Sequence, residues 1–480
     1  MVETDLVIVG FGGAGAAAAI TAHDAGASVV VLEKQRAGAH TPSTRMSGGL
    51  VMAADSAADA AAYLDACAGG MVPADVSAAW ARGATEVLPW LEKTAGLTFS
   101  RINTVEHPEL PGAAGLGVYQ PGRAAFRLDP AAGAGDALFA AVAGAVADRG
   151  IDVRWATPVE RLTVEAGRVV GVRTAAGEFR ARRGVILTCG GYEFDEELKR
   201  DHLRAYPVHF YGNPGNTGDG VRMAQAAGAG LWHMNQMIGR AIGHFPLDGG
   251  WLNFLIDISP PGHLIVDRHG RRYADETMQA KLLHGFYYEM LAYDYEQAEY
   301  CRIPSYWLFD ERRRTAGPLT LTHLGACKVG LYDWSPDNSA EIERGWIGRG
   351  TTPGEAGAAV GMPDPASLDD AVTGYNAVCA AGEDPLGRAP ETLIPLEPPY
   401  YCVPLYPGGS NTSGGPVRDA GGRVLDPYGE PVPGLFAAGE LGQPVGMLYP
   451  ADGANLSEAF CFGRIAAGTA VAPGVEPASA

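Results

Sequence analysis

Gly10, Gly12, Gly15 and Glu33 have the types and the spacing of a dinucleotide-binding site. Gly10 permits a tight turn, Gly12 lets the backbone approach a pyrophosphate, and Gly15 permits close packing of a helix on a strand. A carboxylate at Glu33 can accept hydrogen bonds from ribose hydroxyls, which favours an unphosphorylated adenosine, as in FAD or NAD. The alternative is a glycine-rich turn that only packs, and the flanking residues decide between the two.

These flanking residues predict the elements that would position the glycines. The apolar run 6–9 predicts a strand, the small residues 16–25 predict a helix, and the β-branched run 29–32 predicts a second strand that ends at Glu33. The N-terminus of the helix would face the phosphates with unpaired N–H groups and a partial positive charge. The order of strand, turn, helix and strand predicts an α/β fold with a parallel sheet.

Composition excludes several classes of partner. The 480 residues carry a net charge of −19, which argues against nucleic acid and against anionic membrane surfaces. Seven cysteines without a CxxC pair indicate reduced thiols and predict no metal site. Glu3 and Asp5 stand where a secretory signal would carry basic residues, and no long apolar run lacks glycine or charge. We therefore expect a cytoplasmic protein without membrane insertion.

Further glycine-rich stretches could supply a second edge of the cofactor site. Residues 36–49 are expected to form a polar loop, and residues 215–220 (GNTGDG) precede a helix over 221–227. Residues 435–438 predict a strand that ends in Gly439 and Glu440. Each stretch offers backbone donors to a bound anion or flavin edge. Residues 351–367 and 408–415 are also expected to be loops.

The texture of the chain changes between residues 231 and 398, where aromatic residues become dense and β-branched strands scarce. These aromatic side chains need a core of their own, which predicts an inserted domain. The predicted domains are 1–232 and 399–480 for cofactor binding, with 233–398 as a capping or substrate domain.

The ordered motifs resemble the flavoprotein superfamily of fumarate reductase, succinate dehydrogenase and 3-ketosteroid dehydrogenases over nearly the whole chain. The resemblance is carried by GFGGAG with Glu33, STRMSGG, VILTCGG, GNTGDG, HGRRYADE, VPGLFAAGE and GANLSEAFCFGRIAAG. It implies FAD rather than NAD, held in a Rossmann-like domain with an inserted α+β capping domain. The residues expected to bind FAD are Gly10, Gly12, Gly13, Ala14, Gly15, Glu33, Lys34, Ser43, Thr44, Ser47, Gly48, Gly49, Val159, Thr188, Gly190, Asn216, Thr217, Asp219, Gly439, Glu440, Asn455 and Leu456.

The resemblance also assigns parts of FAD to particular residues. Val159 would touch adenine through its backbone. Asp219 and Glu440 would contact the phosphate and ribityl regions. The amides of Asn455 and Leu456 would face the flavin O2 edge, and the helix that follows would aim its positive end at the reduced flavin.

Some relatives attach FAD through a histidine in a Ser-His-Thr sequence just upstream of a Gly-Gly pair. This chain has His40-Thr41, which lies too far from Gly48 for that arrangement. Noncovalent FAD is therefore expected, and covalent attachment through His40 is the alternative.

Three departures from the family bear on the substrate. Fumarate-type relatives use two arginines and a histidine at positions where this chain has Thr-Met-Gln-Ala-Lys after Glu276, Leu448-Tyr449-Pro450, and Ser410-Asn-Thr-Ser-Gly-Gly415. Without these cationic groups, the charges of a small dicarboxylate would be uncompensated. The segment Tyr449-Pro450-x-x-Gly453 is instead similar to the 3-ketosteroid Δ1-dehydrogenase signature, in which a tyrosine hydroxyl and a glycine N–H bind the ketone oxygen.

The resemblance thus implies a dehydrogenase for a cyclic ketone, steroid-like or smaller, with an unknown electron acceptor. Two donors would stabilise the charge on the ketone oxygen, a tyrosine would accept the α proton, and the β hydrogen would leave as hydride to flavin N5. Tyr119 resembles the family's second active-site tyrosine, and Tyr287 and Tyr288 are substitutes for its capping-domain tyrosine. The alternatives are an enoate reductase of the fumarate or urocanate type, anchored by Lys281 or the arginines 271–272, and a flavin-binding protein without turnover.

Overall fold

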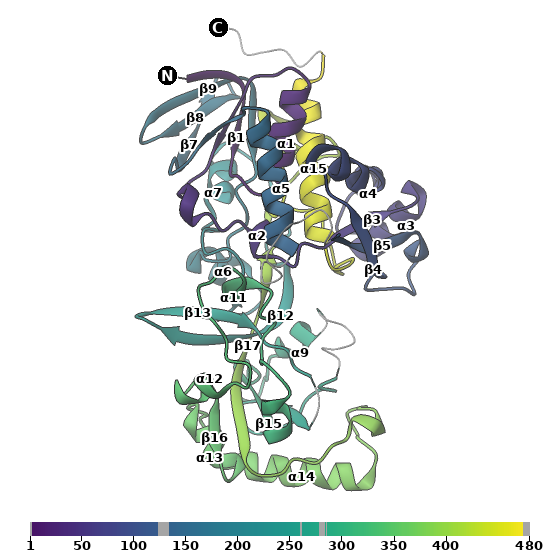
Figure 1. Ribbon diagram of the computed structural model, residues 1–480, viewed down its shortest axis with the longest axis vertical. Coiled ribbons are helices and arrows are strands. Elements are labelled where there is room, and N and C mark those ends of the chain that lie inside the picture. Colours follow the sequence, from purple (N-terminus) through teal and green to yellow (C-terminus); the bar gives the residue numbers. More distant parts are fainter. Residues whose placement is uncertain (1, 123–133, 260–261, 278–283, 285, 474–480) are drawn as a thin grey trace. The chain divides into compact units, whose positions relative to one another are not determined.

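The computed structural model describes residues 2–122, 134–259, 262–277, 284 and 286–473 (Figure 1). The chain divides into two compact units. Unit 1 comprises residues 1–203, 213–237 and 411–480, and unit 2 comprises residues 204–212 and 238–410. In the part of the chain that is described, no helix is long and apolar enough to cross a membrane.

Unit 1 is built on a mainly parallel sheet. At its centre, β1 (Val2–Val9) runs parallel to β2 (Val29–Leu32) on one side and to β9 (Gly177–Leu187) on the other. β6 (Asp152–Arg154) continues the sheet beyond β2, and β20 (Pro431–Ala437) continues it beyond β9, both in parallel. The predicted Rossmann-like α/β architecture is therefore confirmed.

Antiparallel strands complete this sheet, and helices cover it. β8 (Arg168–Thr174) joins β9 to β7 (Val159–Glu165), and β19 (Arg423–Leu425) pairs with β20. Figure 1 shows α1 (Gly13–Asp24), α5 (Ala134–Asp148) and α15 (Ala454–Val471) lying next to one another. A Cβ on Gly463 would lie 2.5 Å from the carbonyl oxygen of Ala14, so this glycine allows α15 to approach α1 closely.

A small antiparallel sheet stands beside these helices in unit 1. Its order is β3 (Val51–Ala54), β5 (Leu116–Pro121) and β4 (Phe99–Asn103). The long helix α4 (Ala74–Ala95) packs against β3, and α3 (Ala57–Ala68) packs against α4. Further elements of unit 1 are η1 (Ala37–Ala39), α2 (Ser43–Met46), η2 (Ala113–Gly115), α6 (Glu196–His202), α7 (Asp219–Ala226), β11 (Leu231–Trp232) and β18 (Gly415–Pro416).

Unit 2 contains a seven-stranded, mainly antiparallel sheet around β17 (Tyr400–Thr412). Its other strands are β10 (His209–Phe210), β12 (Met237–Leu247), β13 (Gly250–Leu255), β14 (His263–Val266), β15 (Ser305–Asp310) and β16 (Gly348–Gly350). Its helices are α9 (Phe286–Met290), α10 (Glu311–Thr315), α11 (Gly325–Lys328), α12 (Ser339–Glu343), α13 (Pro353–Ala359), α14 (Ser367–Ala381) and η4 (Pro390–Thr392).

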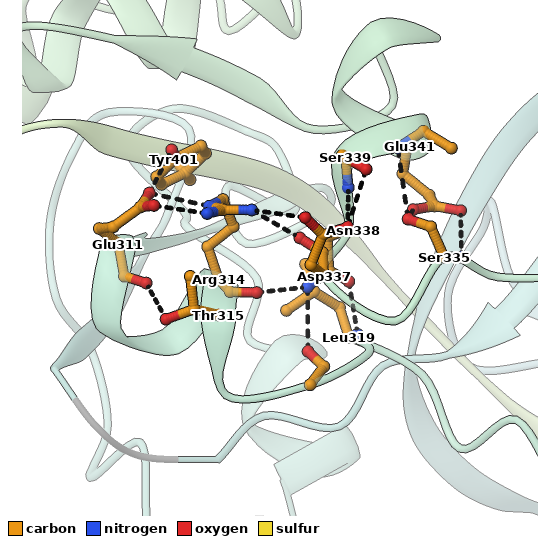
Figure 2. Close-up of polar contacts among 12 residues, drawn as sticks. Glu311, Arg314, Thr315, Leu319, Ser335, Asp337, Asn338, Ser339, Glu341 and Tyr401 are labelled. Carbon is orange, nitrogen blue, oxygen red and sulfur yellow. Dashed lines mark hydrogen bonds and ion pairs between the residues drawn. The ribbon is translucent and has the colours of Figure 1, made fainter.

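Aromatic residues form the core of unit 2, as their density in the sequence predicts. Phe245 stacks on Trp346 with ring centroids 5.0 Å apart, and Trp334 meets Phe254 edge-on. A polar cluster borders this core (Figure 2): Arg314 joins Glu311 to Asp337, and Tyr401 donates to Glu311 at 2.6 Å.

Two predicted loops are wrong. Residues 351–367 contain α13, which begins with a capping box between Thr352 and Glu355. Residues 408–412 of the second loop continue β17. A Cβ on Gly408 would lie 1.8 Å from the carbonyl oxygen of His209, so this glycine marks the close approach of β10 rather than a turn.

Candidate active site

The three glycines of the first turn have different surroundings in unit 1. Gly10 has φ +99°, and a Cβ there would lie 2.6 Å from the carbonyl oxygen of Thr188. A Cβ on Gly15 would lie 2.1 Å from the carbonyl oxygen of Gly10. At Gly12 the nearest atoms would be 3.9 Å away. The fold itself requires glycine at positions 10 and 15, whereas the space beside Gly12 fits a pyrophosphate that approaches the backbone.

The N-cap of the helix that follows this turn has no side chain of its own. Gly12 is the N-cap of α1, and the Gly13 N–H donates to Thr44 Oγ1 at 2.9 Å. Thr188 holds the turn, because its hydroxyl lies 2.9 Å from the carbonyl oxygens of both Val9 and Gly10. The other N–H groups of a first helical turn and its partial positive charge suit phosphate oxygens.

Glu33 is buried at the end of β2 and keeps its negative charge. Its carboxylate accepts the N–H of Phe11 at 2.8 Å and that of Gln35 at 2.7 Å, and His40 Nε2 lies 3.6 Å away. Burial opposes ionisation, but hydrogen bonding to His40 and to these amides lowers the pKa of Glu33. A carboxylate has about four acceptor positions, so ribose hydroxyls can still bind. The His40 ring packs edge-on to Trp155 and lies beside Glu33, the residue expected to bind ribose.

The predicted adenine contact lies close to Glu33. The Thr157 N–H donates to the Glu33 carbonyl oxygen at 2.9 Å, and the Ala156 N–H donates to that of Gln35 at 2.9 Å. Val159 begins β7 two residues later. The backbone of residues 156–159 therefore runs beside the end of β2, where an adenosine would follow its ribose.

The stretch after β2 is not the open loop that its composition suggests. It contains the helical turns η1 and α2. Ser47 donates to the Thr44 carbonyl oxygen at 2.7 Å and accepts the Gly49 N–H at 3.1 Å, with Gly48 half-buried between them. Gly49 has φ +71°, and a Cβ there would lie 2.3 Å from Ala134. The hydroxyls thus brace the backbone of this stretch.

Glu193, which is buried, and Glu440, which is half-buried, form an interacting acidic pair. Glu440 accepts from Asn216 Nδ2 at 2.9 Å and from Ser43 Oγ at 3.0 Å, and Glu193 accepts the Thr412 N–H at 2.7 Å. Burial raises the pKa of Glu193 to about 7, and burial together with the Glu193 charge raises the pKa of Glu440 to about 8. A protonated carboxyl can donate as well as accept, which suits ribityl hydroxyls. Sequence reasoning missed Glu193, although it directly follows the Gly-Gly-Tyr of VILTCGGY.

Two glycines join this acidic pair to the first edge of the site. A Cβ on Gly190 would lie 2.4 Å from Asn216 Oδ1, so glycine leaves room for the amide that binds Glu440. A Cβ on Gly439 would lie 3.1 Å from the Ala14 side chain, which places the end of β20 against α1. The stretches 215–220 and 435–440, which were both expected to add to a second edge of the cofactor site, are therefore adjacent in unit 1.

Lys34, Thr217 and Asp219 make a polar cluster of their own. Lys34 Nζ lies 2.6 Å from Asp219 Oδ2 and 2.8 Å from Thr217 Oγ1, and Thr217 also donates to Asp219 at 3.0 Å. The ammonium compensates the Asp219 carboxylate, which would otherwise repel a phosphate. The cluster therefore ties the first and second glycine-rich stretches together.

Tyr449 and Gly453 lie at the N-terminus of α15. The Tyr449 hydroxyl accepts the Asn455 N–H at 3.3 Å, so its own proton points away from that amide. Gly453 is the N-cap of α15 with φ +82°, and a Cβ there would lie 2.6 Å from the Leu50 backbone. The N-cap residue Gly453 has no side chain of its own, so the Tyr449 hydroxyl accepts a first-turn N–H instead, and the dipole of this 18-residue helix favours negative charge at the same end.

Strand β3 connects this helix end to Tyr119. The Met52 N–H donates to the Gly453 carbonyl oxygen at 3.2 Å, and Val51 is the register partner of Tyr119 on β5. Leu456, in the first turn of α15, is buried. The fold thus brings Tyr119, Tyr449 and Gly453 into one region of unit 1.

An amide network that the sequence did not reveal supports Asn455. Its Nδ2 donates to Asn411 Oδ1 at 2.7 Å, and its Oδ1 accepts from Gln443 Nε2 at 3.1 Å. Gln443 also donates to Ser413 at 3.1 Å. Asn411 and Ser413 belong to the stretch where the family's histidine is absent; Asn411 contacts Asn455 directly, and Ser413 is linked to it through Gln443.

Tyr287 and Tyr288 lie on α9 in unit 2. Tyr287 is buried over Gly239, and its hydroxyl has no hydrogen-bond partner among the described residues. Burial raises the pKa of both phenols. Tyr288 is half-buried, with the Arg204 guanidinium 5.7 Å from its ring centre. Lys281 lies outside the described residues.

The arginines of HGRRYADE are engaged within unit 2. Arg271 pairs with Asp267 at 2.8 Å, and Arg272 pairs with Glu276 at 2.7 Å and with Asp384 at 2.8 Å. Each therefore faces a carboxylate of the chain itself.

Comparison with known proteins places this arrangement in a family. The family model described as FAD binding domain matches residues 5–456. The chain is 28% identical to 4-oxocyclohexanecarboxylate 2-dehydrogenase of Sinomonas cyclohexanicum, over 97% of this chain and 92% of the relative. It is 27% identical to 3-oxosteroid 1-dehydrogenase of Mycolicibacterium smegmatis, over 97% and 96%.

A solved structure has the same fold. The crystal structure of 3-ketosteroid Δ1-dehydrogenase from Sterolibacterium denitrificans, in complex with 1,4-androstadiene-3,17-dione, superposes with a TM-score of 0.81. The similarity covers 98% of this chain and 99% of that chain, at 23% identity. The similarity confirms the predicted fold.

Proposed function

This chain belongs to the FAD binding domain family, and from that membership we propose that it is a dehydrogenase that forms a carbon–carbon double bond next to the carbonyl of a cyclic ketone. The support from the site is the pair Tyr449 and Gly453 at the N-terminus of α15. This is a place where two donors and a helix dipole can stabilise a negatively charged oxygen.

In the proposed mechanism the ketone oxygen binds to the Tyr449 hydroxyl and the Gly453 N–H. Loss of the α proton shifts negative charge onto that oxygen, and the two donors stabilise it because they are already oriented. When bound, FAD supplies the acceptor for the β hydrogen, which leaves with its electron pair. The α proton goes to the phenolate form of a tyrosine, for which Tyr119, Tyr287 and Tyr288 are the candidates. The hydroxyl of Tyr287 is buried, which favours Tyr119 and Tyr288 as the acceptor.

The proposed cofactor contacts follow from the same unit. Gly12 and the α1 N-terminus bind the pyrophosphate, Glu33 the ribose, and Glu440 the ribityl chain. FAD is held noncovalently, because His40 packs beside Glu33 at the adenosine end and not where a flavin ring would lie.

The experiment is anaerobic mixing of the FAD-loaded protein with ring ketones. The substrates to try are 4-oxocyclohexanecarboxylate and a 3-ketosteroid, which are the compounds that the relatives' names indicate. Bleaching of the oxidised flavin absorption, with formation of the enone, supports the proposal. Tyr449→Phe should slow this reduction by roughly 10²–10³-fold, the usual cost of one oxyanion donor, without loss of FAD. Oxidation of reduced protein by an enoate alone would favour the reductase alternative.

A further inference from the structure

Tyr63 lies on α3, outside every sequence motif named above, and its side chain has no exposed surface. Its hydroxyl donates to the Pro450 carbonyl oxygen at 2.6 Å and accepts the His107 N–H at 3.2 Å. The Glu106 N–H donates to the same Pro450 oxygen at 3.1 Å. One buried hydroxyl therefore joins three segments: α3, the loop at residues 106–107, and the turn that follows Tyr449.

The C-terminal end of α3 holds the other side of Tyr449. The Leu448 N–H donates to the Cys67 carbonyl oxygen at 2.9 Å, and the Met447 N–H donates to that of Ala68 at 3.3 Å. A Cβ on Gly446 would lie 2.3 Å from the same Ala68 oxygen, so the chain runs directly against the helix end. The residues on both sides of Tyr449 are thus fixed to α3.

The Tyr449 hydroxyl oxygen accepts a long hydrogen bond from the Asn455 N–H. Its distance to the Asn455 nitrogen is 3.3 Å, longer than the usual 2.9–3.0 Å. The backbone at residues 448–450 carries the Tyr449 ring, so a shift of this backbone moves the phenol oxygen. A phenylalanine at position 63 would fill nearly the same volume, so what the hydroxyl adds is its two hydrogen bonds.

We propose that Tyr63 is a positioning residue for the ketone-oxygen site: its hydroxyl fixes the Pro450 carbonyl and thereby aims the Tyr449 phenol beside Gly453. The inference rests on the proposed function, because it assigns Tyr449 to the ketone oxygen. Tyr63 does not touch the substrate; it acts through Tyr449.

A double-mutant cycle tests the coupling. Tyr63→Phe should lower kcat between about tenfold and hundredfold, with KM and FAD content close to those of the wild type, because a displaced donor acts mainly in the transition state. Adding Tyr63→Phe to Tyr449→Phe should cause almost no further loss, since the group it positions is gone. The matched control is Tyr401→Phe, which removes a buried hydroxyl bond of 2.6 Å to Glu311 in unit 2 (Figure 2) and should leave kcat unchanged. Independent, multiplicative effects of the two substitutions, or no effect of Tyr63→Phe, would overturn the proposal.

A binding measurement extends the test to a protein without turnover. Bound as the anion, 4-nitrophenol mimics the charged oxygen and reports its own ionisation by absorbance. The pKa of the bound phenol should be lowered in the wild type and in Tyr401→Phe, and less lowered in Tyr63→Phe. If the wild type oxidises no ring ketone, the proposed function is refuted while this measurement still decides the role of Tyr63. If Tyr63→Phe does not fold, hydrogen exchange of the wild-type peptide 446–456 is measured instead of the variant. Fast exchange of the Leu448 N–H would refute the fixation of residues 446–450 by α3.

Discussion

The pair of substitutions Gly12→Ala and Gly15→Ala separates cofactor binding from folding. At Gly12 the backbone has φ −98° and ψ −162°, which any residue adopts, and an added Cβ would meet nothing nearer than 3.9 Å. At Gly15 the same methyl would lie 2.1 Å from a backbone oxygen of Gly10. The two positions are three residues apart, yet only one of them has room for a side chain.

The expected magnitudes differ accordingly. Gly12→Ala should cost the FAD-free protein at most about 1 kcal/mol, the price of a poorer helix N-cap. In the FAD complex the methyl occupies the space of the pyrophosphate, and such overpacking costs about 1–3 kcal/mol, which is roughly five- to 150-fold in Kd. Gly15→Ala should destabilise the protein by more than about 3 kcal/mol with or without FAD, because neither the helix nor the turn can move independently.

Flavin fluorescence titration of FAD-free protein gives Kd, and thermal unfolding with and without FAD gives the stability. Gly12→Ala should unfold near the wild-type temperature without FAD and gain much less from added FAD. Gly374→Ala, on α14, adds a methyl group in open surroundings without a positive φ, and it controls for a methyl group away from the site. FAD binding by Gly12→Ala with the wild-type Kd would refute the route of the pyrophosphate past Gly12.

Three further predictions concern charge and attachment. The pKa of Glu440 is raised from 4.5 to about 8, so between pH 4.5 and 8 the folded protein binds more protons than the unfolded chain. The FAD-free protein should therefore lose thermal stability as the pH rises across this range. Glu440→Gln should flatten this pH dependence. Arg388→Met breaks a buried pair with Glu276 and should lower the free energy of urea unfolding by about 3–5 kcal/mol, whereas Arg271→Gln, on a half-exposed arginine, should lower it by less than about 1 kcal/mol. Acid precipitation should leave FAD in the supernatant, and a yellow pellet would contradict noncovalent binding.

The first half of the FAD-binding unit could be predicted from local pattern. Strand β2 has the bounds of its β-branched run, and Glu33 ends it as expected. Helix α1 begins at Gly13, three residues before the predicted start, because the close packing of Gly15 on Gly10 overrides the poor helix propensity of glycine. The strands of unit 2 were harder to predict, since aromatic and glycine residues form them and their pairing partners are distant.

The parts of the candidate site that were missed depend on contacts between distant segments. Tyr63 lies in an alanine-rich helix without a motif, and the carbonyl oxygen that it binds is 387 residues away. Gln443 and Asn411 matter only because Asn455 lies between them. The periodicity and spacing of a single sequence do not predict such long-range contacts. The glycine turn and Glu33, in contrast, lie within one βαβ unit.

The charges of unit 2 bear on the choice between dehydrogenase and enoate reductase. A reductase that anchors its substrate through Arg272 would have to displace Glu276 or Asp384 from a buried pair, which is strongly unfavourable, and Arg271 would have to exchange Asp267 for the substrate. Arg388 also contacts Glu276 and donates to the His263 carbonyl oxygen at 2.6 Å. Arg272, the buried arginine of HGRRYADE, therefore connects the segment after β14 to the segment after α14. The positive charge of Arg272 is compensated by carboxylates within unit 2. A neutral ketone substrate does not need this charge for binding.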